Sequence, residues 1–136
     1  MSDTRQPRKG KIQKHTDLDV YNMAFDAAME AFELSKQFPA EERFSLTDQI
    51  RRSSRSIAAN LGEGWQKRKY PAAFVNKLSD SAGEAGETQV WLQFAVKCGY
   101  LDPESTRPLY NTYDDIISKL VHMQNNPEKW TFPTKK

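Results

Sequence analysis

Four long stretches with helical periodicity, joined by short connections, constrain the fold of this chain more than any other feature. Apolar or small residues recur in each stretch at three- and four-residue steps, as they do on one face of an α-helix. The stretches measure about 22, 23, 27 and 22 residues, or roughly 33 to 40 Å each at 1.5 Å per residue. No segment competes with the alternation of a β-strand. In the first stretch the inward positions are predicted to be Leu18, Tyr21, Phe25, Ala28 and Phe32.

Capping signals predict where the first two helices begin. Thr16, with Asp19 three residues later, is placed to cap the first helix, which Pro39 should end. Ser45 with Asp48 repeats the same arrangement before the second helix.

Proline and glycine mark the other two helices. Pro71 suits the first turn of the third helix, which should close at Gly99 in a left-handed conformation. Asp102 and Pro103 are placed as the cap and first residue of the fourth helix, which should stop before Pro127.

Matched helix lengths and short connections favour antiparallel neighbours, because each helix can then bury one stripe against the others. The sequence therefore predicts an all-α protein, an antiparallel up-down-up-down four-helix bundle over residues 15–130. Residues 1–14 and 131–136 lack periodicity, so we expect a flexible basic N-terminal tail and a C-terminal tail.

Small residues on the second and third helices predict that these two helices approach closely. Gly83 and Gly86 each lower helix propensity by about 1 kcal/mol relative to Ala, so close packing in the bundle or across a subunit contact should compensate. Four thin stripes also leave too little room to bury all the large side chains in one bundle, so we expect a homo-oligomer to cover the excess. The large side chains in question are Trp65, Trp91, Phe94 and Tyr110.

The composition indicates a cytoplasmic protein without membrane contact. No apolar run approaches the ~20 residues of a membrane span, and the polar N-terminus lacks the hydrophobic segment of a secretory signal. The single cysteine, Cys98, excludes an internal disulfide framework, and we expect it to be a small buried residue at a helix end.

Catalytic and metal chemistry have little support in the sequence. His15 and His122 lie far apart, with no cysteine or carboxylate at ligand spacing, so we predict no metal site. Glu84 and Glu87 lie one helical turn apart, but a paired-carboxylate site usually needs a contribution from a second helix. We expect a non-enzymatic protein that uses no cofactor.

Asn60 and Glu63 are predicted to lie at the edge of the core, beside the inward position of Gly64. An amide or a carboxylate left half-buried without hydrogen bonds would cost about 1 to 3 kcal/mol, so we expect bonds to the third helix or to a neighbouring subunit. We interpret the pair as a polar clamp between helices, with a ligand site as the alternative.

Positive charge is concentrated in two segments, although the net charge is only +2. Residues 1–14 hold five basic residues and one acid. The other segment is part of the second helix and its end, where Glu63 is the only acid, and its cations should form a basic ridge facing away from the core. They are Arg51, Arg52, Arg55, Lys67, Arg68 and Lys69.

This ridge supports two hypotheses of different class. One is weak, sequence-tolerant binding of nucleic acid, with Trp65 as a possible stacking surface. The alternative is a protein-interaction scaffold whose basic ridge makes salt bridges with a neighbouring subunit or partner.

Several segments resemble the four-helix bundle proteins encoded in intervening sequences of bacterial 23S rRNA genes. The matching segments are Leu46–Ser53, Ser56–Gly64, Gly86–Leu92 and Gly99–Leu101. The resemblance covers roughly residues 17 to 125, and its most specific element is Asn-x-x-Glu-Gly. The residues of this chain that match the family's motif positions are Arg51, Asn60, Glu63, Gly64 and Glu87.

The resemblance implies a ring-like homopentamer without an established enzymatic activity. It also implies a relationship to the accessory variability determinant of diversity-generating retroelements. That protein is a basic pentameric bundle that binds nucleic acid and a reverse transcriptase. RNA or DNA and a reverse transcriptase are therefore the partners that the resemblance suggests.

Overall fold

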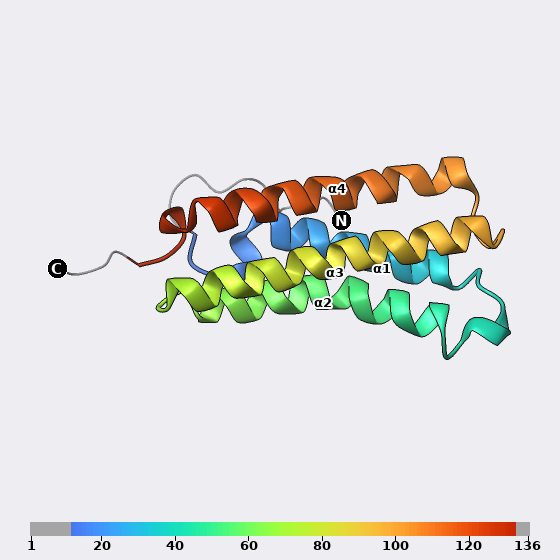
Figure 1. Ribbon diagram of the computed structural model, residues 1–136, viewed down its shortest axis with the longest axis horizontal. Coiled ribbons are helices and arrows are strands. Elements are labelled where there is room, and N and C mark those ends of the chain that lie inside the picture. The colour runs from blue at the N-terminus through green and yellow to red at the C-terminus, as the bar shows by residue number, and fades with distance from the viewer. Residues whose placement is uncertain (1–11, 133–136) are drawn as a thin grey trace, which may run out of the picture.

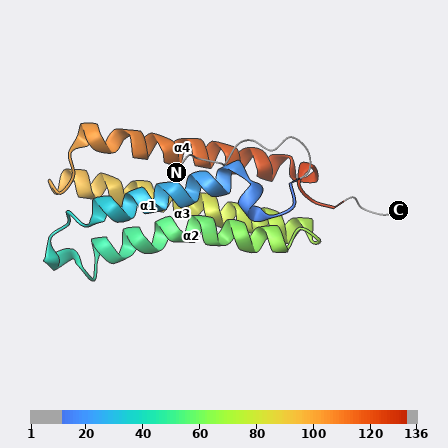
Figure 2. The same cartoon turned by 180° about the vertical axis from the view of Figure 1, so that it is seen from behind.

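The structure is a computed structural model that describes residues 12–132, and it consists of four long helices packed side by side (Figure 1). They are α1 (Asp19–Ser35), α2 (Leu46–Gln66), α3 (Pro71–Lys97) and α4 (Pro103–Asn125). Three short 3₁₀ turns accompany them: η1 (His15–Asp17), η2 (Ala40–Glu42) and η3 (Pro127–Lys129). No strand occurs within residues 12–132. The helices alternate in direction, because each connection joins neighbouring ends, and the predicted all-α four-helix bundle is confirmed (Figures 1 and 2).

The core is formed by one stripe from each helix, as the periodicity predicts for α2, α3 and α4. Its largest fully buried aliphatic side chains are Ile50, Ile57, Leu61, Leu78, Leu92, Leu109, Ile116 and Leu120. Tyr113 and Phe74 are buried among them, and burial raises the pKa of the Tyr113 hydroxyl.

The stripe predicted for α1 is partly wrong. The helix faces the core with Val20 and with alanines at 24, 27, 28 and 31, whereas Phe25 is 48% exposed and Phe32 is half-buried. Small alanines allow α1 to lie close to the core, and the aromatic residues are displaced to its flank. Hydrophobicity alone could not separate these two neighbouring stripes.

The start of α1 also differs from the prediction. Thr16 lies inside η1, and Leu18 occupies the N-cap position of α1 without a side-chain bond, so the Thr16 cap is wrong. Asp17 instead accepts hydrogen bonds of 3.0 Å from the backbone nitrogens of Gln13 and Lys14. α1 has 17 residues, because the 3₁₀ turn delays its start and because it ends at Ser35, before the predicted stop at Pro39.

A glutamate, and not Ser45, caps α2. Ser45 holds the N-cap position, but its hydroxyl donates to Glu42 Oε1 at 2.6 Å. The same oxygen accepts from the backbone nitrogen of Leu46 at 3.1 Å, and Oε2 accepts from the Tyr100 hydroxyl at 2.8 Å. The bonds from Ser45, Tyr100 and Leu46 lower the pKa of Glu42, and the bond to Glu42 raises the pKa of Tyr100 to about 12. Glu42 therefore ties the start of α2 to the α3–α4 turn.

The predicted boundaries of α3 and α4 are confirmed. Pro71 opens α3, and Gly99 follows its end with φ +80°, a conformation that favours glycine. Asp102 caps α4 by accepting from the backbone nitrogen of Ser105 at 2.9 Å, and Pro103 is the first helical residue.

Several predictions about burial are wrong. Cys98 is exposed at the end of α3 and is not buried. Trp65 is only 3% exposed and belongs to the core, so one bundle does accommodate it. Trp91 and Tyr110 are half-buried, and Phe94 is the member of this set that remains exposed, at 53%.

The predicted close approach of α2 and α3 is confirmed. The hydroxyls of Ser53 and Thr88 share a hydrogen bond of 2.8 Å, and Ser81 donates to the Ile57 carbonyl at 2.8 Å. A Cβ atom added at Gly64 would lie 2.8 Å from the Cβ of Lys77.

Gly83 and Gly86 do not take part in this approach. Apart from the neighbouring backbone of α3 itself, a Cβ atom at either position would meet no atom of the described residues within 4 Å. The bundle itself therefore does not compensate for their low helix propensity.

The ends of the described region lie against the bundle. Ile12 packs against the core, and the Gln13 carbonyl accepts a hydrogen bond of 3.2 Å from Trp65 Nε1. The rest of the two predicted tails, residues 1–11 and 133–136, lies outside the described residues. Among the described helices, none combines the length and the apolar character that crossing a membrane requires.

Candidate nucleic-acid interface

The three arginines of α2 lie on two flanks of the helix and not on one ridge. Arg52 reaches α3, where its Nη1 lies 3.4 Å from Glu84 Oε1 and its Nη2 pairs with Glu87. Glu87 Oε2 also accepts from Trp91 Nε1 at 3.2 Å. Two carboxylates therefore neutralise Arg52 within the bundle, and this arginine holds α2 to α3.

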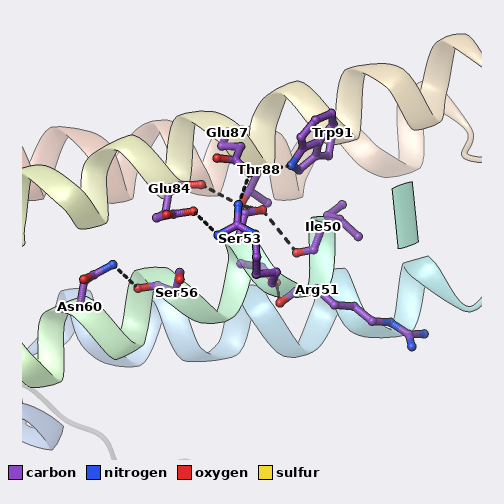
Figure 3. Close-up of polar contacts among 11 residues, drawn as sticks. Ile50, Arg51, Ser53, Ser56, Asn60, Glu84, Glu87, Thr88 and Trp91 are labelled. Atoms are coloured by element: carbon purple, nitrogen blue, oxygen red, sulfur yellow. Dashed lines mark hydrogen bonds and ion pairs between the residues drawn. The ribbon is translucent and has the colours of Figure 1, made fainter. Parts of the chain in front are cut away.

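Arg51 and Arg55 lie on the flank that faces α1. Figure 3 shows Arg51 directed away from Glu84 and Glu87. Its Nε donates to Ser35 Oγ at 2.8 Å, and its guanidinium lies 4.6 Å from the ring centre of Phe32. The guanidinium of Arg55 lies 5.7 Å from the same ring. The prediction of one ridge is wrong because successive helical residues turn by about 100°, which separates Arg52 from Arg51.

The cluster at residues 67–69 follows the end of α2. Lys67 is the C-cap of the helix. Arg68 turns back, so that its Nε donates to the Trp65 carbonyl at 2.9 Å and its guanidinium lies 3.6 Å from the indole ring centre. Burial lowers the pKa of Arg68. Trp65 is thus buried beneath Arg68, and its predicted use as a stacking surface is wrong.

Five of the six predicted basic residues are not neutralised by the described part of the chain. Arg52 is the one that forms ion pairs with carboxylates of residues 12–132. Arg51, Arg55, Lys67, Arg68 and Lys69 have no such pair in this region. Their positive charge is available to an external anion.

The polar clamp is present in part. Glu63 Oε1 lies 3.1 Å from Lys77 Nζ on α3, as expected for a bond between helices. Asn60 instead donates to the carbonyl of Ser56 in its own helix at 2.9 Å and not to α3. Its alternative bond, to a neighbouring subunit, stays a prediction. A short amide side chain on a helix readily reaches the carbonyl four residues earlier. Gly64 is buried where α2 meets α3.

Two aromatic residues beside the arginines were not predicted as site residues. Phe25 and Phe32 were assigned to the core of the first helix, but both lie on the flank of α1 that faces α2. Within residues 12–132, no group of three or more His, Cys, Asp and Glu side chains lies close enough together to hold a metal ion.

Comparisons with known proteins identify the family and support the fold. The family model described as 23S rRNA-intervening sequence protein matches residues 16–122. A similar crystal structure is that of a protein with unknown function from the S23 ribosomal protein family of Bacteroides thetaiotaomicron. It shares 28% identity with this chain, covers 78% of this chain and 95% of its own, and superposes with a TM-score of 0.70. No curated protein matches this chain.

Proposed function

Because the chain belongs to the family of 23S rRNA-intervening sequence proteins, we propose that it is a non-enzymatic bundle that binds RNA or DNA weakly and with little sequence preference. The observation that supports this proposal is the set of five cations along α2 and at its end that lack ion pairs within residues 12–132. The proposal places the protein in the cytoplasm.

The arrangement of these cations suits a polyanion better than a small anion. Arg51, Arg55 and residues 67–69 are spread along the axis of α2 and its end over about 25 Å at 1.5 Å per residue, although Lys67 is turned by about 160° from Arg51. A nucleic-acid backbone carries regularly spaced phosphates over such a distance, and its affinity comes mainly from released counterions. None of these contacts reads a base edge, so the binding is expected to tolerate different sequences.

The paired arginine provides a matched control for this proposal. The slope of log affinity against log salt concentration measures how many phosphates the protein contacts. Arg55→Gln is expected to make this slope less steep by about 0.7, the contribution of one phosphate contact on a single strand. Arg52→Gln removes the same charge but should leave the slope unchanged, because Glu84 and Glu87 already neutralise Arg52. It should instead lower the melting temperature, since the two glutamates lose their partner. Fluorescence anisotropy at several salt concentrations measures both slopes.

Equal slopes for Arg55→Gln and the wild type would contradict this assignment. A larger effect of Arg52→Gln than of Arg55→Gln would also contradict it. The latter result would favour the scaffold alternative, in which the α2–α3 flank holds a subunit or partner.

We also propose that the protein is a homo-oligomer, with a pentamer as the form that the resemblance implies. Phe94 and Val90 are exposed on α3, and Gly86 leaves open space on the same helix. Exposed apolar groups of this kind are often covered by a second subunit. Light scattering after size exclusion should give about five times the chain mass of 15.7 kDa. A stable monomer at micromolar concentration would contradict the oligomer.

A further inference from the structure

A groove of about 410 Å³ runs between α1 and α2, which lie side by side (Figure 2). Aromatic and long apolar side chains of α1 form one wall, and small residues of α2 form the other. The α1 wall includes Tyr21, Phe25 and Met29, and the α2 wall includes Ala58, Ala59 and Gly62. The small side chains of α2 leave the α1 rings uncovered.

The rings form a row along α1. The ring centres of Tyr21 and Phe25 are 6.2 Å apart, and the two planes are tilted by 38°. His15 meets Tyr21 edge-on at 4.7 Å, at the end of the groove near Gly62. Phe25 is 48% exposed, so a large part of its ring is free to contact another planar group.

The charge around the groove favours an anionic ligand. Arg55 lines it and has no ion pair within residues 12–132, and no carboxylate is among the lining residues. At 100° per residue the exposed acids of α1 fall on the flank of the helix away from Phe25. These acids are Asp19, Asp26, Glu30 and Glu33.

We propose that this groove binds single-stranded nucleic acid, with a base stacked on Phe25 and the neighbouring phosphate held by Arg55. This inference rests on the proposed function and adds the strand type and the stacking residue. Aromatic platforms beside cations are the usual means by which proteins bind single strands, because every unpaired base exposes a flat face. A duplex buries these faces, so it gains nothing from the groove.

The charge also argues against a purely apolar segment as the occupant. An apolar segment packed over Phe25 would take Arg55 out of water without giving it a partner, which is strongly unfavourable. A phosphate supplies that partner, and the base covers the apolar ring.

The test compares Phe25→Ala with Phe44→Ala in the full chain. Phe44 is also an exposed ring with an arginine nearby, since Arg43 lies 5.6 Å from its centre, but it does not line the groove. Phe25→Ala should lower the affinity for a labelled thymidine oligonucleotide by about tenfold, the effect of losing one base–aromatic contact. Phe44→Ala should not change it. Neither variant should change the affinity for a duplex or for an abasic strand of equal length, because phosphate contacts remain.

The other outcomes separate a failure of the groove proposal from a failure of the proposed function. If the wild type binds the oligonucleotide and Phe25→Ala binds it equally well, the groove assignment is wrong and the proposed function stands. If the wild type binds no nucleic acid, both are wrong. If Phe25→Ala changes the molar mass in light scattering, the groove is a subunit contact, and the inference is overturned.

Discussion

Replacing Arg51, Arg55, Lys67 and Lys69 together with glutamine is expected to lower the affinity for a single-stranded oligonucleotide by roughly 4 × 10³-fold at 50 mM salt. The logarithm of the affinity falls with the logarithm of the salt concentration by about 0.7 for each phosphate contact. Four contacts therefore raise the affinity at 50 mM salt by about this factor over its value at 1 M salt, and the variant loses that gain. None of the four residues forms an ion pair with the described part of the chain, so the melting temperature should fall only by what the loss of the bond from Arg51 to Ser35 costs. Fluorescence anisotropy and a thermal melt give the two quantities.

A variant with the same charge change at the other end of the bundle is the control. It replaces Lys36, Arg43, Lys97 and Arg107, which lie near η2 and the α3–α4 turn. If binding depends only on net charge, this variant should lose as much affinity as the first. Our account requires that it keep most of the wild-type affinity, and equal losses would contradict it.

Gly64→Ala is expected to destabilise the bundle by about 1–3 kcal/mol, although alanine is the better helix former by about 1 kcal/mol. The new Cβ would lie 2.8 Å from Lys77 Cβ, which is close to the backbone and cannot swing away. The helices would have to separate, which would lengthen the bonds of Ser53 to Thr88 and of Ser81 to Ile57. The free energy of unfolding in urea measures this effect.

Gly83→Ala serves as the matched control for helix propensity. It lies on α3, and apart from the neighbouring backbone of that helix its Cβ would meet no atom of the described residues within 4 Å, so the substitution should stabilise the chain by about 0.4–1 kcal/mol. A Gly64→Ala variant as stable as Gly83→Ala would show that α2 and α3 do not approach as closely as the structure places them.

The helices could be predicted because their signals are local. Pro71, Gly99 and Asp102 act through backbone conformation or bonds within a few residues, and all three hold their expected places. The cap of α2 is different, because Glu42 enters from a separate 3₁₀ turn and is bound by Tyr100, which is 58 residues away in sequence. A contact of that kind depends on the tertiary fold and leaves no local pattern.

The candidate site was only partly predictable for the same reason. Sequence spacing identified the cations of α2, but the partners of each depend on the neighbouring helix. Arg52 meets two glutamates of α3, whereas Arg55 meets an aromatic ring of α1. The exposed position of Phe25 could not be predicted because it shares a periodicity with core residues, and only the packing of the alanine stripe shows that it lies outside the core.

The most direct test of nucleic-acid binding is the anisotropy of a labelled single-stranded oligonucleotide titrated with the wild-type protein at 50 and 200 mM salt. With about four phosphates neutralised, the affinity should fall roughly 50-fold between the two concentrations. No binding at 50 mM salt would contradict the proposed function, and it would leave the interaction scaffold as the remaining account of the basic residues.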